Sequence, residues 1–400
     1  MTAALAFFRS RLWLWELTAV AWLLLLPYIM TAHGHLDWSG HALGRDFVNY
    51  WTAGHLVGEG HVQPIFDRDG FLAAEHRLFD PRLPFHFWSY PPVALFLVAP
   101  LALFPYVTGL IAWSLFGVAV LVPAARSFLD NRREWVLLAL CPATAIDIAL
   151  GQNGAITAAI MIGGLSLWDR RPIVAGAILG LLVFKPQLAI MLPVAVLAGR
   201  RWSIMAAAGV VAIGLLLLSV PVFGIEAWRG FFGGTLETQR LMLTQGVGPF
   251  QWMMPTVLMS GRLMGMHFIV AATLQAVFAV GAVFALWTSW RGAGDLEAKA
   301  ALLMTATFVA SPQAFNYDLI PAAFAALVVW RRDRSGWGHG LSLLVWGLPI
   351  LMIALQAMEG IGERGYLVKP VMAIAPLALA GLTWRLHRLA VGARTSGIDL

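Results

Sequence analysis

Long apolar stretches alternate with short, arginine-rich connections along most of this chain. The first stretch, 12–32, is about 20 residues long, enough helix to cross roughly 30 Å of hydrocarbon. It is longer than the apolar core of a signal peptide, and we expect it to be retained as a first helix. The pattern predicts an all-α polytopic membrane protein, with residues 1–400 forming a single integral membrane domain.

Composition supports this class. The chain is 60% hydrophobic and 12% charged, whereas soluble proteins are typically about 45–50% apolar and about 25% charged. The net charge of +6 does not indicate a nucleic-acid partner, because the positive residues form small clusters between apolar segments. The single cysteine, Cys141, excludes an intrachain disulfide.

The basic clusters predict an orientation in the membrane. Seven groups, nearly all in connections of ten residues or fewer, hold 17 of the 27 Lys and Arg residues. The groups are Arg9 and Arg11; Arg126, Arg132 and Arg133; Arg170 and Arg171; Arg200 and Arg201; Arg291 and Lys299; Arg331, Arg332 and Arg334; and Arg385, Arg388 and Arg394. By the positive-inside rule, all seven are expected in the cytoplasm.

This orientation predicts about twelve crossings with both termini in the cytoplasm. They are expected at 12–32, 106–125, 135–150, 154–168, 172–184, 187–199, 203–223, 264–290, 298–312, 317–330, 340–357 and 366–384. A long extracytoplasmic loop, 33–90, should carry short interfacial helices, and 224–262 should form a second such loop. If the run 91–104 also crossed the membrane, the number of crossings would be odd and both termini could not lie in the cytoplasm. We therefore expect 91–104 to form a re-entrant or partial segment.

Several predicted crossings are short. The segments 172–184 and 187–199 have only about 13 residues, or about 20 Å of helix. Such segments are tolerated where they are buried in protein or line a watery cavity. Their outer tips carry the unusual polar residues of the chain, and the candidate chemistry therefore gathers on one side of the membrane.

The first loop offers a candidate base. Asp46 lies beside Arg45 and is followed by Tyr50 and Trp51. A carboxylate near aromatic rings could take a proton from a sugar hydroxyl while the rings stack on sugar faces. The alternative is a helix cap at Asp46, with the aromatic side chains resting at the interface.

Lys185 is the candidate ligand for a phosphate. It is the only basic residue between the Arg170 and Arg200 groups, and Pro186 interrupts helical bonding behind it. A lone ammonium at a broken helix tip suits a lipid-linked phosphate, with Arg45 as a possible second ligand. The alternative is a lysine that snorkels to the interface.

Three other tips are polar. Asp147 precedes Gln152 and Asn153, which two glycines flank; this stretch could be a simple turn or part of a site. Asp318 could be a second carboxylate, but pairing with Lys185 or an outside arginine is the favoured interpretation. Phe87 to Pro92 is interpreted as an aromatic belt with a proline break. No metal-binding motif stands out, and we expect no cofactor.

Read in order, these motifs resemble glycosyltransferase family 87, the bacterial polyprenyl-phosphate-sugar-dependent mannosyltransferases of the GT-C superfamily. The matching stretches are Asp46-Phe47 with Tyr50-Trp51 and Ala53-Gly54, Tyr90-Pro91-Pro92, Pro100 to Pro105, Gly151-Gln152-Asn153, Phe184-Lys185-Pro186-Gln187, Ser311-Pro312 and Tyr317-Asp318-Leu319. Family members commonly carry a histidine after Ser-Pro; this chain has Gln313, Phe315 and Asn316 there, so we expect no base in that segment.

The resemblance implies a GT-C-like bundle in the bacterial inner membrane with an extracytoplasmic active site. It implies that Asp46, an acidic residue of the first loop, acts in catalysis, and that the donor is a polyprenyl-phosphate sugar, with mannose as the expected sugar. The acceptor would be a lipid or glycan; membrane lipids are further partners, and nucleic acid is not. The expected substrate-binding residues are Tyr50, Trp51, Gln152, Asn153, Gln187 and Asp318.

Two other functions remain open. A transporter or flippase would also use broken helices and intramembrane ions. Against it, the polar breaks cluster at one face rather than at the midplane, and no inverted repeat is visible. A polymerase or ligase of surface glycans would share the lipid-phosphate donor.

Overall fold

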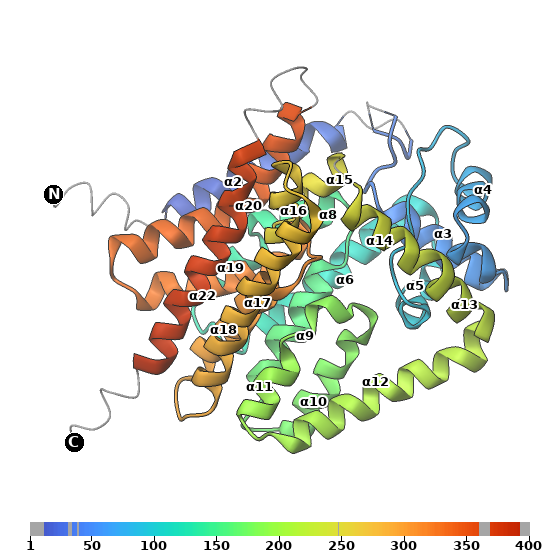
Figure 1. Ribbon diagram of the computed structural model, residues 1–400. Coiled ribbons are helices and arrows are strands. Elements are labelled where there is room, and N and C mark those ends of the chain that lie inside the picture. The colour runs from blue at the N-terminus through green and yellow to red at the C-terminus, as the bar shows by residue number, and fades with distance from the viewer. Residues whose placement is uncertain (1–11, 31–33, 38–39, 247, 360–368, 393–400) are drawn as a thin grey trace.

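The computed structural model describes residues 12–30, 34–37, 40–246, 248–359 and 369–392 (Figure 1). Arg9, Arg11 and Arg394 of the basic groups lie outside the described residues, as does the predicted exit of the first crossing near Ala32. The described residues form helices joined by irregular connections and no strand, only one isolated bridge between Leu36 and Ala42. The predicted all-helical class is therefore confirmed.

Four described helices are long and apolar enough to cross a membrane. They are α6 (Tyr106–Arg126), α12 (Trp202–Phe223), α17 (Phe268–Trp290) and α20 (Gly336–Glu359). Their outer faces expose large apolar side chains, with Leu217 67% and Val280 69% accessible, as expected for surfaces that face lipid. Twelve full-length crossings are thus not confirmed.

The other predicted crossings correspond to shorter elements, some in two pieces. These are α2 (Leu12–Met30), α7 (Arg132–Ala139), α8 (Pro142–Ala149), α9 (Gly154–Ser166), α10 (Pro172–Gly180), η4 (Leu181–Phe184), η5 (Pro186–Leu188), α11 (Leu192–Ala198), α18 (Leu296–Ala310), α19 (Ile320–Arg332), η9 (Lys369–Ala373) and α22 (Ile374–Gly392). Helix α18 is buried along nearly its whole length and packs against α9, α17, α19 and α22.

The segment 91–104 folds into three short pieces, η2 (Pro92–Ala94), α5 (Leu95–Val98) and η3 (Ala99–Leu103). Both α5 and η3 pack on α3 (Phe47–Gly58) of the first loop. Twelve residues are too few to cross the hydrocarbon, in agreement with the expected partial segment.

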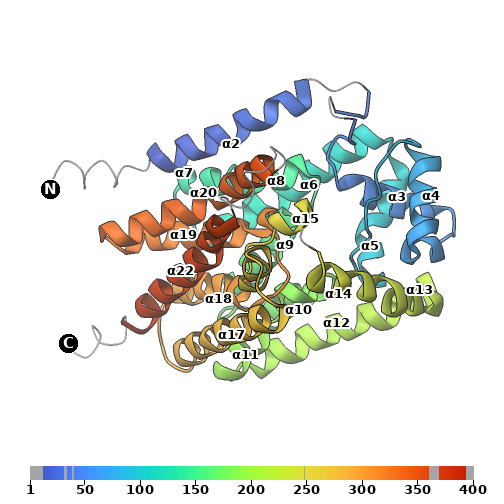
Figure 2. The same ribbon diagram turned by 45° about the horizontal axis from the view of Figure 1, so that its top comes forward.

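The first loop also contains η1 (Gln63–Phe66) and α4 (Arg68–Leu78). The stretch predicted as the second loop folds as α13 (Ile225–Gly230), a π-helical turn η6 (Phe231–Thr235), α14 (Leu236–Thr244), α15 (Pro249–Trp252) and α16 (Val257–Leu263). The two loops contact each other. Both α13 and η6 pack on η1, and the Gln239 side chain donates to the Ser89 carbonyl at 2.6 Å. Figure 2 shows α13 and α14 beside α3 and α4, at one end of α12.

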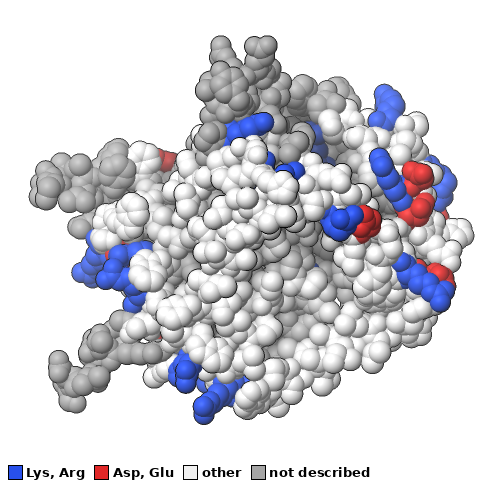
Figure 3. Space-filling model, viewed as in Figure 1, with Lys and Arg blue, Asp and Glu red and all other residues white. Residues whose placement is uncertain are grey.

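Several of the arginine-rich connections lie together at one end of the bundle, away from the two loops. Arg331 donates to Glu134 at 3.1 Å, and Arg332 donates to Glu297 at 2.5 Å. A cavity lined by residues of the 127–130, 170, 297 and 331–332 stretches lies among them. In Figure 3, Lys and Arg side chains lie at the left and lower edges of the molecule, and a largely uncharged surface occupies the middle of the view between them and the paired charges at the right.

Four short helices connect the arginine end to the polar tips. Helices α9, α18 and α19 have 13, 15 and 13 residues, and α10 with η4 has a similar length. At about 1.5 Å per residue, each is roughly 20 Å long, against roughly 30 Å of hydrocarbon. Each of these helices is therefore roughly 10 Å shorter than the hydrocarbon is thick.

Candidate active site

Asp46 lies at the start of α3 and is partly buried. It occupies the position of a helix cap, but its side chain makes no capping hydrogen bond. Instead, Oδ2 accepts a hydrogen bond from Nε2 of Gln152 at 2.8 Å. Asp46 thus stands at the cap position, but its side chain does not cap the helix. A residue 106 positions away holds Oδ2, and no hydrogen bond from the described residues reaches Oδ1.

A sharp turn delivers Gln152 to Asp46. Gly151 has a φ of +56°, in the left-handed region that favours glycine. A Cβ at this position would overlap the Phe47 side chain and lie 2.8 Å from the Gly44 carbonyl oxygen. The Gln152 carbonyl accepts from the indole nitrogen of Trp113 at 2.8 Å. Backbone geometry thus fixes the glutamine between α8 and α9.

Two buried tyrosines form the next layer. The Tyr50 hydroxyl donates to Oε1 of Gln152 at 2.5 Å and lies 2.8 Å from the Tyr90 hydroxyl. A hydroxyl has a single proton, so Tyr90 must donate to Tyr50. Nδ2 of Asn153 donates to both tyrosines, at 3.1 and 3.0 Å.

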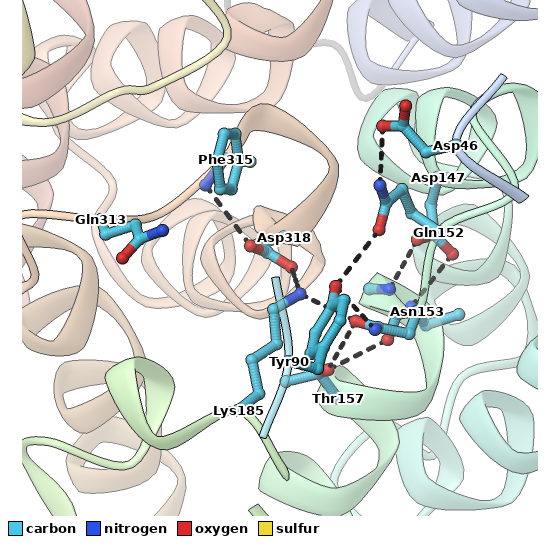
Figure 4. Close-up of polar contacts among 12 residues, drawn as sticks. Asp46, Tyr90, Asp147, Gln152, Asn153, Thr157, Lys185, Gln313, Phe315 and Asp318 are labelled. Carbon is cyan, nitrogen blue, oxygen red and sulfur yellow. Dashed lines mark hydrogen bonds and ion pairs between the residues drawn. The ribbon is translucent and has the colours of Figure 1, made fainter. Parts of the chain in front are cut away.

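Lys185 begins this network. Its Nζ donates to Oδ1 of Asn153 at 2.7 Å and to Oδ1 of Asp318 at 2.5 Å. Lys185 and Asp318 are each 1% accessible, so the favoured interpretation of Asp318 as the partner of Lys185 agrees with the geometry. Figure 4 shows the contacts running from Asp318 and Lys185 across to Asp46.

The hydrogen bonds of this network all run from donor to acceptor in the same sense, from Lys185 to Asp46. Lys185 donates to Asn153, Asn153 to the tyrosines, Tyr50 to Gln152, and Gln152 to Asp46. Reversing either amide would face donor to donor or acceptor to acceptor. Since hydrogen bonds in such a chain polarise one another, an ammonium at one end supports a carboxylate at the other.

Asp147 has a structural role. Its two carboxylate oxygens accept from the backbone nitrogens of Gly154 and Ala155, at 2.5 and 3.1 Å. The first backbone N–H groups of a helix lack partners within the helix and favour a nearby negative charge. Asp147 therefore fixes the start of α9, from which Asn153 projects.

A second acid lies near Asp46. Glu75, on α4, is fully buried, and its Oε2 accepts from the backbone nitrogen of His86 at 3.3 Å. Burial raises the pKa of Glu75 to about 8, with a smaller contribution from the charge of Asp46. Burial also raises the pKa of Asp46, against the charge of His86 and the Gln152 hydrogen bond. The pKa of His86 is lowered by its burial.

The other predicted residues lie outside this chain of contacts. Arg45 pairs with Asp37 at 2.8 Å. Trp51 is 8% accessible, donates to the Phe104 carbonyl at 2.9 Å and packs against Tyr106. Gln187 is half-buried in η5, behind Lys185.

Sequence reasoning missed Tyr90 and Glu75 as members of the site. Tyr90 was assigned to an aromatic belt, and nothing local distinguishes it from a tyrosine that faces the interface. Glu75 did leave a signal. It lies four positions after Phe71 in α4, and residues four apart share one helix face. Both are buried.

Comparison with known proteins supports the resemblance. The profile of Glycosyltransferase family 87 matches residues 88–312, more than half of the 400 residues. No curated protein and no solved structure matches the chain. The matched stretch includes Tyr90, Gln152 and Lys185, whereas Asp46 precedes it and Asp318 follows it. The chain therefore belongs to glycosyltransferase family 87, a family of membrane glycosyltransferases.

Proposed function

We propose that the protein transfers a sugar, with mannose as the expected one, from a polyprenyl-phosphate donor to a hydroxyl of a lipid or glycan. The proposal places the arginine end in the cytoplasm and the site on the outer side of a bacterial inner membrane. The observation that carries it is the accessible carboxylate of Asp46, held at the acceptor end of a network that starts at a buried ammonium.

Asp46 acts as the general base. The acceptor oxygen attacks the anomeric carbon while its proton passes to the free oxygen of Asp46, and the bond from carbon to phosphate oxygen breaks. Attack opposite the leaving group inverts the anomeric centre. A raised pKa suits this role, because a base is most effective when its pKa approaches the working pH. The acid limb of kcat/KM should therefore lie above pH 3.8, the ordinary pKa of an aspartate.

Lys185 acts on the leaving group. An ammonium has three N–H donors, of which Asn153 and Asp318 take two. We assign the third to a phosphate oxygen of the departing polyprenyl phosphate; because Lys185 is only 1% accessible, the bound donor has to displace the side chains that cover it. Because Asp318 balances much of the lysine charge, the lysine contributes chiefly a directed hydrogen bond, which strengthens as charge develops on the phosphate.

The depth of the site favours a lipid-linked donor. The polar tips lie about 20 Å from the arginine end, within the hydrocarbon thickness. A polyprenyl chain can stay among the lipid tails while its phosphate reaches Lys185. A water-soluble nucleotide sugar would have to leave water to reach the same place.

The test measures transfer from labelled polyprenyl-phosphate mannose by the full-length protein in liposomes, with lipid and glycan extracts of cells lacking the protein as acceptors. Asp46→Asn should reduce the rate about 100-fold to 10,000-fold, the usual contribution of a positioned base. Asp67→Asn is the matched control, because Asp67 caps α4 in the same loop and Asn caps equally well. Activity of Asp46→Asn near wild type would exclude the base role.

The same assay separates the alternatives. A transferase releases free polyprenyl phosphate, whereas a transporter leaves the donor intact. A polymerase or ligase of surface glycans would require a lipid-diphosphate oligosaccharide, so turnover of that donor alone would contradict the proposal.

A further inference from the structure

A basic cavity of about 470 Å³ lies at the arginine end, well apart from the Asp46 network. Its walls come from the α9–α10, α11–α12 and α17–α18 connections and the first turn of α18. Four cationic side chains line it, against the single carboxylate of Asp169: Arg200, Arg201, Arg291 and Lys299. The proposed transfer reaction uses none of these residues.

The charge of this cavity is only partly balanced. Arg201 pairs with Asp169. Among the described residues, no carboxylate lies within ion-pairing distance of Arg200 or Arg291. Lys299 is 8% accessible and donates to the Gly292 carbonyl at 2.6 Å. Two arginines from two connections, without a carboxylate partner among the described residues, therefore converge on one small space.

Two further observations indicate a ligand. Trp290 lines the cavity and is 4% accessible, yet its indole N–H finds no partner within the described structure. Buried donors of this kind normally have a partner. Arg200 has a φ of +52°, a strained conformation for a non-glycine residue, and such strain concentrates at functional sites.

The setting indicates the source of that ligand. Helix α12 starts and α17 ends at the cavity, and both are lipid-facing spans. Trp202 and Trp287, on these helices, are 56% and 40% accessible. Exposed tryptophans of spanning helices mark the headgroup level. One turn farther from the cavity on the same helices, Met205 and Phe284 are also exposed and extend the apolar surface. In Figure 3 the basic side chains at the lower edge border this uncharged surface.

We propose that this cavity binds the phosphate of an anionic phospholipid, with its acyl chains lying along the exposed faces of α12 and α17. Arg200 and Arg291 contact the phosphate oxygens, and the Trp290 N–H supplies a further donor. Basic pockets between spanning helices are known to hold such headgroups. A free phosphate compound shares the chemistry of the headgroup but would gain nothing from the apolar surface.

The test is native mass spectrometry of the full-length protein in detergent, titrated with phosphatidylglycerol, phosphatidylcholine or glycerol 3-phosphate. Wild type should bind phosphatidylglycerol most tightly. The double variant R200Q/R291Q should bind it about tenfold more weakly or worse, since two basic contacts are lost. The variant R200K/R291K should keep most of the binding. The matched control is R132Q/R133Q, which removes two exposed arginines at the same end but outside this cavity.

Three outcomes would overturn the proposal. R200Q/R291Q could bind phosphatidylglycerol as well as wild type does. The control could lose as much binding, which would indicate general surface charge. Glycerol 3-phosphate could bind as tightly as the lipid, which would identify a site for soluble phosphates. Equal melting temperatures of all variants without lipid would establish that each one is folded.

Discussion

At the scale of single residues, each end of the network depends on the other. Asp46 is the last acceptor and Lys185 the first donor, and two amides with fixed orientation lie between them. The lysine also balances Asp318 in a place that water does not reach. Its substitution therefore has two separable effects, one on stability and one on the orientation of Asn153.

Lys185→Met should lower the free energy of unfolding by about 3–5 kcal/mol, because it leaves Asp318 buried without its cation. The double variant K185M/D318N removes both charges and should recover most of that loss while remaining inactive. Thermal unfolding in detergent micelles measures the first effect, and donor turnover the second. A single variant as stable as wild type would contradict the buried pair.

Glu75 should give the stability a pH dependence. Its pKa rises from 4.5 to about 8 on folding, so between these values the folded protein holds a proton that the unfolded chain releases. Stability from this group is therefore complete below about pH 4.5 and is lost as the pH rises through about 8. His86, whose pKa is lowered, contributes in the opposite direction.

Glu75→Gln isolates this contribution. The variant should match wild type near pH 4.5 and become progressively more stable than wild type towards pH 8.5. Melting temperatures of the two proteins across this range provide the measurement. Parallel curves would show that Glu75 does not carry the shift.

At the scale of elements, short helices and tight turns bring the site together. Five helix ends meet here, because α8, η4 and α18 end and α9 and α19 begin, and a glycine or a proline lies within two residues of each end. The Gly151 turn has the least freedom, because it carries a positive φ against the backbone of the first loop.

Gly151→Ala should therefore impair transfer at least tenfold, since the added methyl group displaces Gln152 from Asp46. Gly209→Ala is the matched control. A Cβ at Gly209, in the middle of α12, meets no atom within 4 Å, and alanine favours a helix by about 1 kcal/mol. Transfer rates and melting temperatures of both variants test this. Wild-type activity in Gly151→Ala would mean that the turn does not position the site.

The sequence predicted the elements better than the contacts. The expected crossings 203–223 and 264–290 correspond to α12 and α17. A long apolar run between arginines can form little else than one long helix, so the sequence predicts these two elements well. The expected crossing 135–150 instead breaks into α7 and α8, where Pro142 starts a new helix. Asp46 stays a predicted site residue, and nothing local in the sequence indicates that Gln152 holds it.

At the scale of the whole molecule, the two ends of the bundle differ in charge. One end gathers the arginine-rich connections, and the other carries exposed pairs such as Glu59 with Arg77 and Glu237 with Arg240. The positive-inside rule predicts that the end rich in arginine faces the cytoplasm. The proposed orientation follows from it, with the Asp46 side outside.

Single cysteines test the orientation. Cys141 is buried and can be replaced by alanine to give a cysteine-free background. Arg240→Cys should react with a membrane-impermeant maleimide in intact spheroplasts, and Arg132→Cys only after lysis, because both positions are exposed. The reverse pattern would invert the topology.

The distance in sequence between Lys185 and Asp318 affects how the protein is made. Their side chains are 133 residues apart in the chain, and at roughly 5–20 residues per second synthesis of that interval takes roughly 7–27 s. During this time Lys185 has no carboxylate from Asp318, and an unpaired cation inside the membrane is costly. The ion pair, and with it the complete site, can therefore form only after α18 and the segment that carries Asp318 have been made, which makes completion of the site a late step in membrane assembly.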